Sequence, residues 1–194
     1  MKRVCVFCGA SPGNDPVYAE AAAALGRAIA ARGLGLVYGG GSVGLMGVVA
    51  KAAQDAGAEV IGVIPHVLMA REVHNTEIKD LRLVETMHER KALMASLSDG
   101  FLALPGGFGT LDEAFETLTW SQLGIQKKGL VFVDVLGYWS GLERLMNRML
   151  AEGFLKPQTR SLAMIADGPD AALDALAGFV PPADAPVWAT PAQI

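Results

Sequence analysis

The stretch Gly100-Phe101-Leu102-Ala103-Leu104-Pro105-Gly106-Gly107-Phe108-Gly109-Thr110-Leu111-Asp112-Glu113 decides the fold, because it joins a strand to a helix. Its first five residues form an apolar run, typical of a strand covered on both faces. A helical pattern begins at Leu111. The three glycines between them let the backbone approach a ligand closely, and the free N–H groups of a helix start attract anions. Because α/β proteins place ligands at such turns, the stretch predicts a phosphate site beside acidic side chains.

The same residues also match a helix-capping pattern. Thr110-x-x-Glu113 is a capping box, with Thr110 as the N-cap and Glu113 reaching back to it. A capping box does not need the glycines, so a capped helix without a ligand is the alternative interpretation. The two roles are compatible, because a capping contact would hold Glu113 still beside a ligand.

Strands and helices alternate on both sides of this stretch. We predict strands at residues 4–7, 34–38, 60–64, 81–84, 100–104, 130–135 and 162–165. We predict helices at residues 16–32, from a glycine-rich turn to about 56, and at 87–97, 111–123, 138–152 and 169–179. The strands are continuous apolar runs, which indicates an α/β fold: a doubly wound, Rossmann-like parallel sheet with helices on both faces. We expect a single Rossmann-like nucleotide-binding domain over residues 1–180 and a Pro-rich tail over 181–194.

Composition narrows the class of protein. The chain has 194 residues and a net charge of -4, and it contains no block of Lys and Arg, which argues against nucleic acid as a partner. It shows no signal-peptide pattern and no apolar run of about 18 residues, so we expect no membrane span and a cytoplasmic location. Cys5 and Cys8 lie three positions apart in a predicted strand and should face opposite ways. We therefore interpret them as packing residues rather than a redox pair.

A second glycine-rich turn runs through Gly39-Gly40-Gly41-Ser42-Val43-Gly44 and fits Gly-x-Gly-x-x-Gly. It could contact a nucleotide, chiefly through Gly41 and Ser42, or serve only for close helix packing. A dinucleotide site is a third possibility. That possibility is weakened because the turn follows the second strand, and because the next strand ends in Pro65-His66 without an acid for a ribose hydroxyl.

Arg90 and Lys91 lie near the start of the predicted helix 87–97. Cations at this end oppose the helix dipole. A functional role would explain that cost, and a solvated surface pair is the alternative. The three histidines, His66, His74 and His88, do not show metal-ligand spacing, so we predict no metal site.

Four motifs in this order resemble the Lonely Guy family, the cytokinin-activating nucleoside 5′-monophosphate phosphoribohydrolases. Members of this family were long labelled lysine decarboxylases. The matching pieces are Gly39-Gly40-Gly41-Ser42-Val43-Gly44-Leu45-Met46-Gly47, then Pro65 with Leu68-Met69-x-Arg71-Glu72, then Met87-His88-x-Arg90-Lys91, and Pro105-Gly106-Gly107-Phe108-Gly109-Thr110-x-x-Glu113. Matching elements run from about Val4 to Ile165, nearly the whole chain.

The resemblance implies cleavage of the N-glycosidic bond of a nucleoside 5′-monophosphate such as AMP, giving a free base and ribose 5-phosphate. It implies Arg90 and Glu113 as the catalytic pair, no cofactor, and a homodimer. The substrate-binding residues that it implies are Glu72, Lys91, Gly106, Gly107, Phe108, Gly109, Thr110, Leu111, Asp112 and Thr119. Plant members usually have Glu at the position of Asp112 and Tyr at the position of Phe108, which leaves the preferred base open. Which group activates water also stays open, with Glu113 and Glu72 as candidates. A non-catalytic nucleotide-binding or carrier protein on the same fold is the alternative function.

Overall fold

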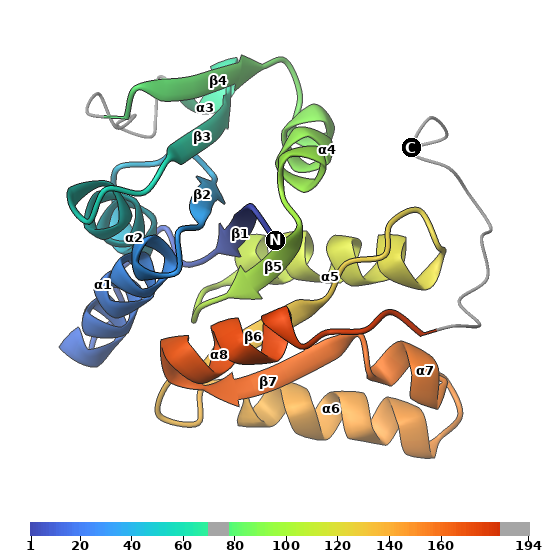
Figure 1. Cartoon of the computed structure of the whole chain (residues 1–194). Helices are drawn as coiled ribbons and strands as arrows, with labels where there is room; N and C mark the ends of the chain where they lie inside the picture. Colours follow the sequence, from blue (N-terminus) through green and yellow to red (C-terminus); the bar gives the residue numbers. More distant parts are fainter. Residues whose placement is uncertain (70–77, 183–194) are drawn as a thin grey trace.

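The sheet holds seven strands, and every neighbouring pair is parallel. The computed structural model describes residues 1–69 and 78–182 (Figure 1). The strands are β1 (Arg3–Phe7), β2 (Gly35–Tyr38), β3 (Val60–Pro65), β4 (Asp80–Val84), β5 (Gly100–Ala103), β6 (Leu130–Asp134) and β7 (Ala163–Asp167). Their order across the sheet is β4-β3-β2-β1-β5-β6-β7. This arrangement confirms the predicted doubly wound parallel sheet.

The helices cover both faces of the sheet and enclose two cores. They are α1 (Pro16–Ala31), α2 (Gly44–Asp55), α3 (His66–Met69), α4 (Met87–Leu97), α5 (Phe108–Gln122), α6 (Ser140–Ala151), α7 (Pro157–Arg160) and α8 (Gly168–Ala177). Side chains of β1 alternate between the cores: Val4 and Val6 pack with α1, α2 and α8, whereas Cys5 and Phe7 pack with α4, α5 and α6. Cys8 lies in the first core, and both thiols are free and buried. The prediction that Cys5 and Cys8 face opposite ways is therefore confirmed.

Local sequence signals set several helix ends. The Asp15 carboxylate accepts a hydrogen bond from the backbone N–H of Val17 at 3.0 Å, which caps α1 as predicted. Gly33, at φ +66°, follows the end of that helix, where a left-handed residue is needed. In α4 the Thr86 hydroxyl accepts from the Glu89 N–H at 3.1 Å, so this helix starts with a side-chain cap. The short helices α3 and α7 were not expected from the sequence.

Helix α5 begins three residues earlier than predicted. Its N-cap is Gly107, which has no side chain to cap the helix, and Thr110 is its third residue. The predicted Thr110–Glu113 capping box is therefore wrong. The cause is that the first turn of α5 packs directly against the backbone of residue 106. A Cβ on Gly106 would lie 2.1 Å from the Thr110 hydroxyl. Only a glycine there permits the turn to begin this soon.

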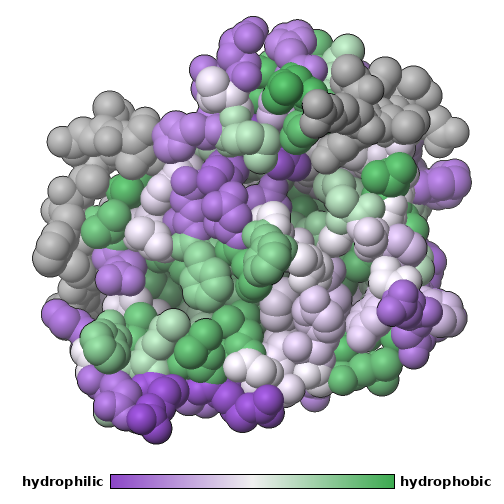
Figure 2. Space-filling view, turned by 180° about the vertical axis from the view of Figure 1, so that it is seen from behind, coloured by the Kyte–Doolittle hydropathy of each residue, from purple (hydrophilic) through white to green (hydrophobic). Residues whose placement is uncertain are grey.

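Figure 2 shows the surface seen from behind, where apolar residues gather between a hydrophilic cluster near the middle and a hydrophilic lower edge. Of the helices in residues 1–69 and 78–182, none is long and apolar enough to cross a membrane. The predicted Pro-rich tail from residue 183 onward, and Arg71 and Glu72 of the second motif piece, fall outside the described residues.

Candidate active site

A cavity lined by the candidate catalytic residues Arg90 and Glu113 opens where the strand order reverses, between β1 and β5. Ligands of doubly wound sheets bind at this switch point, beyond the carboxyl ends of the strands. The loops here are joined by backbone hydrogen bonds of 3.0 Å, from Gly9 N–H to the Pro105 carbonyl and from Leu45 N–H to the Gly9 carbonyl. The cavity has a volume of about 480 Å³. Its lining residues are Cys8, Gly9, Ala10, Ser11, Pro12, Gly13, Tyr18, Leu45, Met46, Arg90, Pro105, Gly106, Gly107, Gly109, Thr110, Glu113 and Tyr138.

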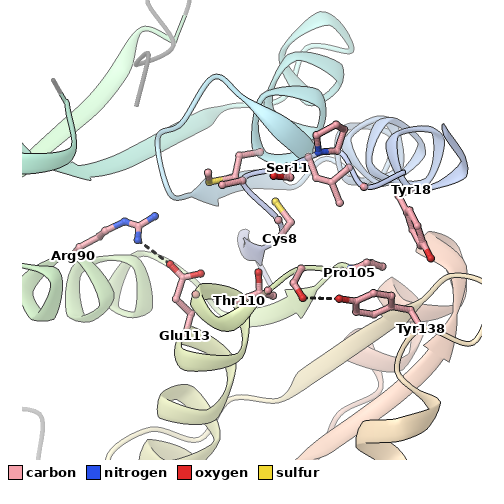
Figure 3. A pocket seen from close by; sticks show the side chains of 17 residues that line it. Cys8, Ser11, Tyr18, Arg90, Pro105, Thr110, Glu113 and Tyr138 are labelled. Atoms are coloured by element: carbon pink, nitrogen blue, oxygen red, sulfur yellow. Dashed lines mark hydrogen bonds and ion pairs between the residues drawn. The ribbon is translucent and has the colours of Figure 1, made fainter. Parts of the chain in front are cut away.

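A buried ion pair closes one end of this cavity (Figure 3). Arg90 Nη1 from α4 lies 3.0 Å from Glu113 Oε1 of α5, and the two side chains are only 8% and 10% exposed. The guanidinium also donates from Nε to the Val63 carbonyl at 3.1 Å and from Nη2 to the Gly39 carbonyl at 3.2 Å. The pair is therefore held by three separate elements, and Glu113 is fixed by a charge on another helix rather than by a cap.

Gly39 makes room for the arginine. A Cβ on residue 39 would lie 2.0 Å from Arg90 Nη2, a distance that no real contact allows. Three other glycines of the same turn also serve close approach. A Cβ on Gly44 would lie 2.3 Å from the Ala10 backbone, and one on Gly47 would lie 2.0 Å from the Ser42 carbonyl oxygen. Gly40 takes a φ of +77°. Close packing and the admitted arginine thus explain Gly39, Gly44 and Gly47. The turn follows β2, next to the switch point between β1 and β5.

The start of α5 forms the floor of the cavity beside the ion pair. Gly107, Gly109 and Thr110 line the cavity there. The first N–H groups of a helix have no partners inside the helix, so they are available to an anion. Glu113 follows Thr110 by three residues, about one turn farther along the same helix. A phosphate at the helix start and a reacting carbon at Glu113 can therefore belong to one small ligand.

Cys8 lies in the wall of the cavity, but its thiol is not suited to act as a nucleophile. Burial, reinforced by the Glu113 carboxylate, raises the pKa of the Cys8 thiol far above its ordinary range. A thiol needs the thiolate form to attack. Among residues 1–69 and 78–182, no group of three or more His, Cys, Asp or Glu side chains is placed to hold a metal ion.

Several residues predicted for the site lie outside the cavity lining. Lys91 Nζ forms ion pairs with Asp112 at 3.1 Å and with Glu116 at 2.9 Å, which tie α4 to α5 beside the Arg90–Glu113 pair. Burial lowers the Lys91 pKa, but the hydrogen bonds to Glu116 and Asp112 outweigh it, so the pKa is raised and the ammonium stays charged. Phe108 is 93% exposed. The other predicted residues that do not line the cavity are Gly41, Ser42, Leu111 and Thr119, and Glu72 falls outside the described residues.

Comparisons with known proteins agree with the motifs. The family model described as "Possible lysine decarboxylase" matches residues 46–176. A relative from Oryza sativa subsp. japonica, named "Probable cytokinin riboside 5'-monophosphate phosphoribohydrolase", is 46% identical over 181 residues, which is 93% of this chain and 86% of the relative. A cytokinin riboside 5′-monophosphate phosphoribohydrolase from Arabidopsis thaliana is 44% identical over 181 residues, 93% of this chain and 85% of that one. The chain belongs to the Lonely Guy family. The resemblance inferred from the four motifs is thereby confirmed.

Solved structures with this fold extend beyond the Lonely Guy family. The Moco carrier protein from Chlamydomonas reinhardtii superimposes with a TM-score of 0.70 at 23% identity, over 91% of this chain and 96% of that chain. A molybdenum cofactor binding protein from Rippkaea orientalis has a TM-score of 0.65 at 21% identity, over 90% and 94% of the two chains. At such identities the likeness concerns the fold alone. Function must therefore be argued from the site.

The structure adds cavity residues that sequence reasoning missed. They come from the loop after β1, residues 8–13, from α1 and α2, and from the turn before α6, which brings Tyr138. The sequence Gly9-Ala10-Ser11-Pro12-Gly13 carries a turn signal for the loop after β1. Because β1 borders the point where the strand order reverses, knowledge of the strand order would have identified this loop as part of the site. No signal in the local sequence marks Tyr138, which lies 32 residues from its hydrogen-bond partner.

Proposed function

We propose that the protein hydrolyses the N-glycosidic bond of a purine nucleoside 5′-monophosphate, including AMP and cytokinin-type nucleotides, to a free base and ribose 5-phosphate. The observation that carries the proposal is the buried Arg90–Glu113 pair, 3.0 Å apart at one end of the cavity. A buried ion pair adds little net stability, because the cost of desolvating both charges offsets their attraction, so stability alone does not explain this pair. Relatives with 44% and 46% identity bear the name of this activity.

The 5′-phosphate would bind at the start of α5. Its oxygens would accept hydrogen bonds from the backbone N–H groups of Gly107, Gly109 and Thr110, which line the cavity. The absence of side chains on the two glycines lets the phosphate come close to the backbone. The positive end of the helix dipole favours the same anion. This end of the cavity therefore selects for a phosphorylated ribose.

Glu113 would act on the ribose. Loss of the base leaves oxocarbenium character on the sugar ring, and a fixed carboxylate stabilises that charge. The ion pair with Arg90 holds the carboxylate in one position, so it need not reorganise during the reaction. Arg90 would orient the substrate and offset negative charge on the leaving base or on the phosphate. Water would be activated by Glu113 or by Glu72.

We also propose that Lys91 and Asp112 support the site from outside the cavity lining. Lys91 joins Asp112 and Glu116 of α5 at 3.1 Å and 2.9 Å. Lys91 follows Arg90 directly in sequence, and Asp112 directly precedes Glu113. They would hold α4 and α5 at the spacing that the catalytic pair needs.

The protein is proposed to act as a cytoplasmic homodimer without a cofactor. The family resemblance supports the homodimer and the lack of a cofactor. An apolar groove between α4 and α5 also supports the homodimer. The groove measures about 660 Å³ and is lined among others by Val84, Leu93, Trp120 and Ile125. A second copy of the chain would cover these side chains. Light scattering at micromolar concentration tests the dimer, and a single species of monomer mass would contradict it.

The activity is tested by incubating the protein with AMP and with its N6-isopentenyl analogue and measuring free base by chromatography. We expect base and ribose 5-phosphate in equal amounts. Adenosine is the matched control, because it lacks the phosphate that the start of α5 would bind. If nucleotides bind but no purine monophosphate releases base, the carrier function is favoured instead.

A further inference from the structure

Tyr138 contacts the proposed phosphate loop from the far end of the cavity. Its hydroxyl donates a hydrogen bond to the Gly106 carbonyl at 2.7 Å. Figure 3 shows Tyr138 and Tyr18 at one end of the cavity and the Arg90–Glu113 pair at the other. The reaction proposed above assigns no role to this tyrosine, although it lines the same cavity.

The turn before α6 is built to hold this tyrosine in place. Leu136 has a φ of +55° and Gly137 a φ of +71°, so the turn contains two successive left-handed residues. A leucine in this region is strained, and strain of this kind persists only where the surroundings enforce it. The Asp134 carboxylate accepts from the Trp139 N–H at 2.8 Å and closes the turn. The Tyr138 side chain is therefore presented from a defined backbone.

Aromatic contacts fix the orientation of the ring as well. The Tyr138 ring packs edge-on against Trp139, with centroids 4.8 Å apart, and against Tyr18 at 5.9 Å. Trp139 packs in turn against Phe132 of β6 at 4.9 Å. Tyr138 is 43% exposed, and its two ring contacts together with the hydrogen bond to Gly106 orient its side chain.

The acceptor belongs to the peptide that joins Gly106 to Gly107. In a trans peptide the C=O and the following N–H point in opposite directions, and the described chain has no cis peptide. When Tyr138 holds the Gly106 carbonyl, the Gly107 N–H points away from Tyr138. Figure 3 shows Thr110 and Glu113 on that opposite side of the cavity. Two adjacent glycines would otherwise allow this peptide to rotate.

We propose that Tyr138 is a positioning residue for phosphate: it locks the Gly106–Gly107 peptide so that the Gly107 N–H is aimed at the 5′-phosphate before substrate arrives. This inference rests on the proposed function, because it assumes that the phosphate binds at the start of α5. The single hydroxyl proton is already used by the Gly106 carbonyl. Tyr138 therefore has no proton left to donate to a phosphate oxygen, and its proposed effect on the phosphate passes through the peptide.

The test is Tyr138→Phe, which removes the hydroxyl and keeps the ring contacts. We expect KM for AMP, and Kd for ribose 5-phosphate by calorimetry, to rise together by about three- to tenfold, as for loss of one hydrogen bond. kcat should change by less than about twofold, and Kd for adenosine should not change, because the effect concerns the phosphate. Tyr38→Phe is the matched control, since it removes a hydroxyl in the core outside the cavity lining.

Hydrogen exchange of the ligand-free protein separates positioning from direct contact. The Tyr138→Phe variant should exchange the Gly9 amide, which donates to the Pro105 carbonyl at 3.0 Å, faster than wild type, because the neighbouring peptide is no longer locked. Unchanged exchange, unchanged Kd for ribose 5-phosphate, or an equal loss of adenosine affinity would each overturn the inference. The binding measurements do not need turnover. A wild type that binds ribose 5-phosphate but releases no base would overturn the proposed function, and the ratio of the two Kd values would still decide the role of Tyr138.

Discussion

The substitution Gly39→Ala tests whether the position of Arg90 controls activity without touching any charged residue. Residue 39 directly follows β2, and its backbone φ is not in the left-handed region, so alanine is tolerated by the backbone itself. The added Cβ would lie 2.0 Å from Arg90 Nη2, whereas real contacts keep at least 3.0 Å. The guanidinium must therefore move by about 1.0 Å or more, away from the place where it meets Glu113.

The size of the effect follows from this displacement. A misplacement of about 1 Å in a catalytic arrangement costs roughly 100-fold in rate, or about 2.7 kcal/mol of transition-state stabilisation. The hydrogen bond from Arg90 Nη2 to the Gly39 carbonyl, now 3.2 Å, is also disturbed. Disturbing one buried hydrogen bond to a charged group costs about 1–3 kcal/mol of folding stability. We expect the melting temperature to fall by several degrees and the fold to persist.

Base release from AMP, followed by chromatography, measures the effect, and circular dichroism confirms the fold. Gly141→Ala in α6 is the matched control, because the nearest atom to a new Cβ there is the end of the Arg144 side chain at 3.9 Å. In an Arg90→Lys background the clashing Nη2 is absent, so Gly39→Ala should add less than about a twofold loss. Wild-type kinetics in Gly39→Ala, or the same 100-fold loss in both backgrounds, would refute the reasoning.

Three further predictions concern single side chains. Glu113→Gln should keep the fold and lower kcat by more than about 100-fold, whereas Glu143→Gln on exposed α6 should keep normal turnover; a fully active Glu113→Gln would remove Glu113 from the reaction. Thr86→Ala, which removes the cap of α4, should cost about 1 kcal/mol in urea denaturation, and an unchanged midpoint would contradict the role of this cap. The backbone N–H groups of Lys2 and Arg3 hold the Asp99 pKa below its ordinary value of 3.8, so the stability that Asp99 provides is present above that value and is lost as the pH falls below it. Asp99→Asn should therefore lower the midpoint near neutral pH, with a difference from wild type that shrinks in acid.

The fold was largely predictable because its signals are local. Seven apolar runs, separated by helical patterns and glycine turns, were enough to predict a parallel sheet covered on both faces. The helix predicted at residues 16–32 agrees with α1, whose ends carry the local signals Asp15-Pro16 and Gly33. The start of α5 was misplaced because the Thr110–Glu113 pattern competes with a tertiary constraint, the contact of Thr110 with the backbone at Gly106. A side-chain cap contributes only about 1 kcal/mol, so a tertiary contact of this kind can override a local capping signal.

The site was predictable only in part, and the missing part depends on distant contacts. Arg90 and Glu113 were predicted from the family motifs, and the structure brings them within 3.0 Å of each other. Gly39 was predicted within a glycine motif, but its contact with Arg90 spans 51 residues of sequence. The role of Tyr138 depends on the pairing of β5 with β6, which puts the two loops side by side. Sequence patterns carry no information on such contacts until the strand order is known.

The burial of the Arg90–Glu113 pair is itself an argument that the pair serves a reaction. An ion pair that is 8% and 10% exposed gains little stability over apolar residues of the same size, because desolvation offsets the attraction. The chain nevertheless arranges two backbone carbonyls around the guanidinium and leaves residue 39 without a side chain to admit it. It also places the cation near the start of α4, where the helix dipole opposes it. If folding alone had shaped this end of the cavity, apolar residues would meet every requirement at lower cost. Replacing both members, as in Arg90→Met with Glu113→Leu, should therefore cost no more stability than the two hydrogen bonds that the Val63 and Gly39 carbonyls lose, and should abolish base release. A double variant that unfolds would show that the pair is structural.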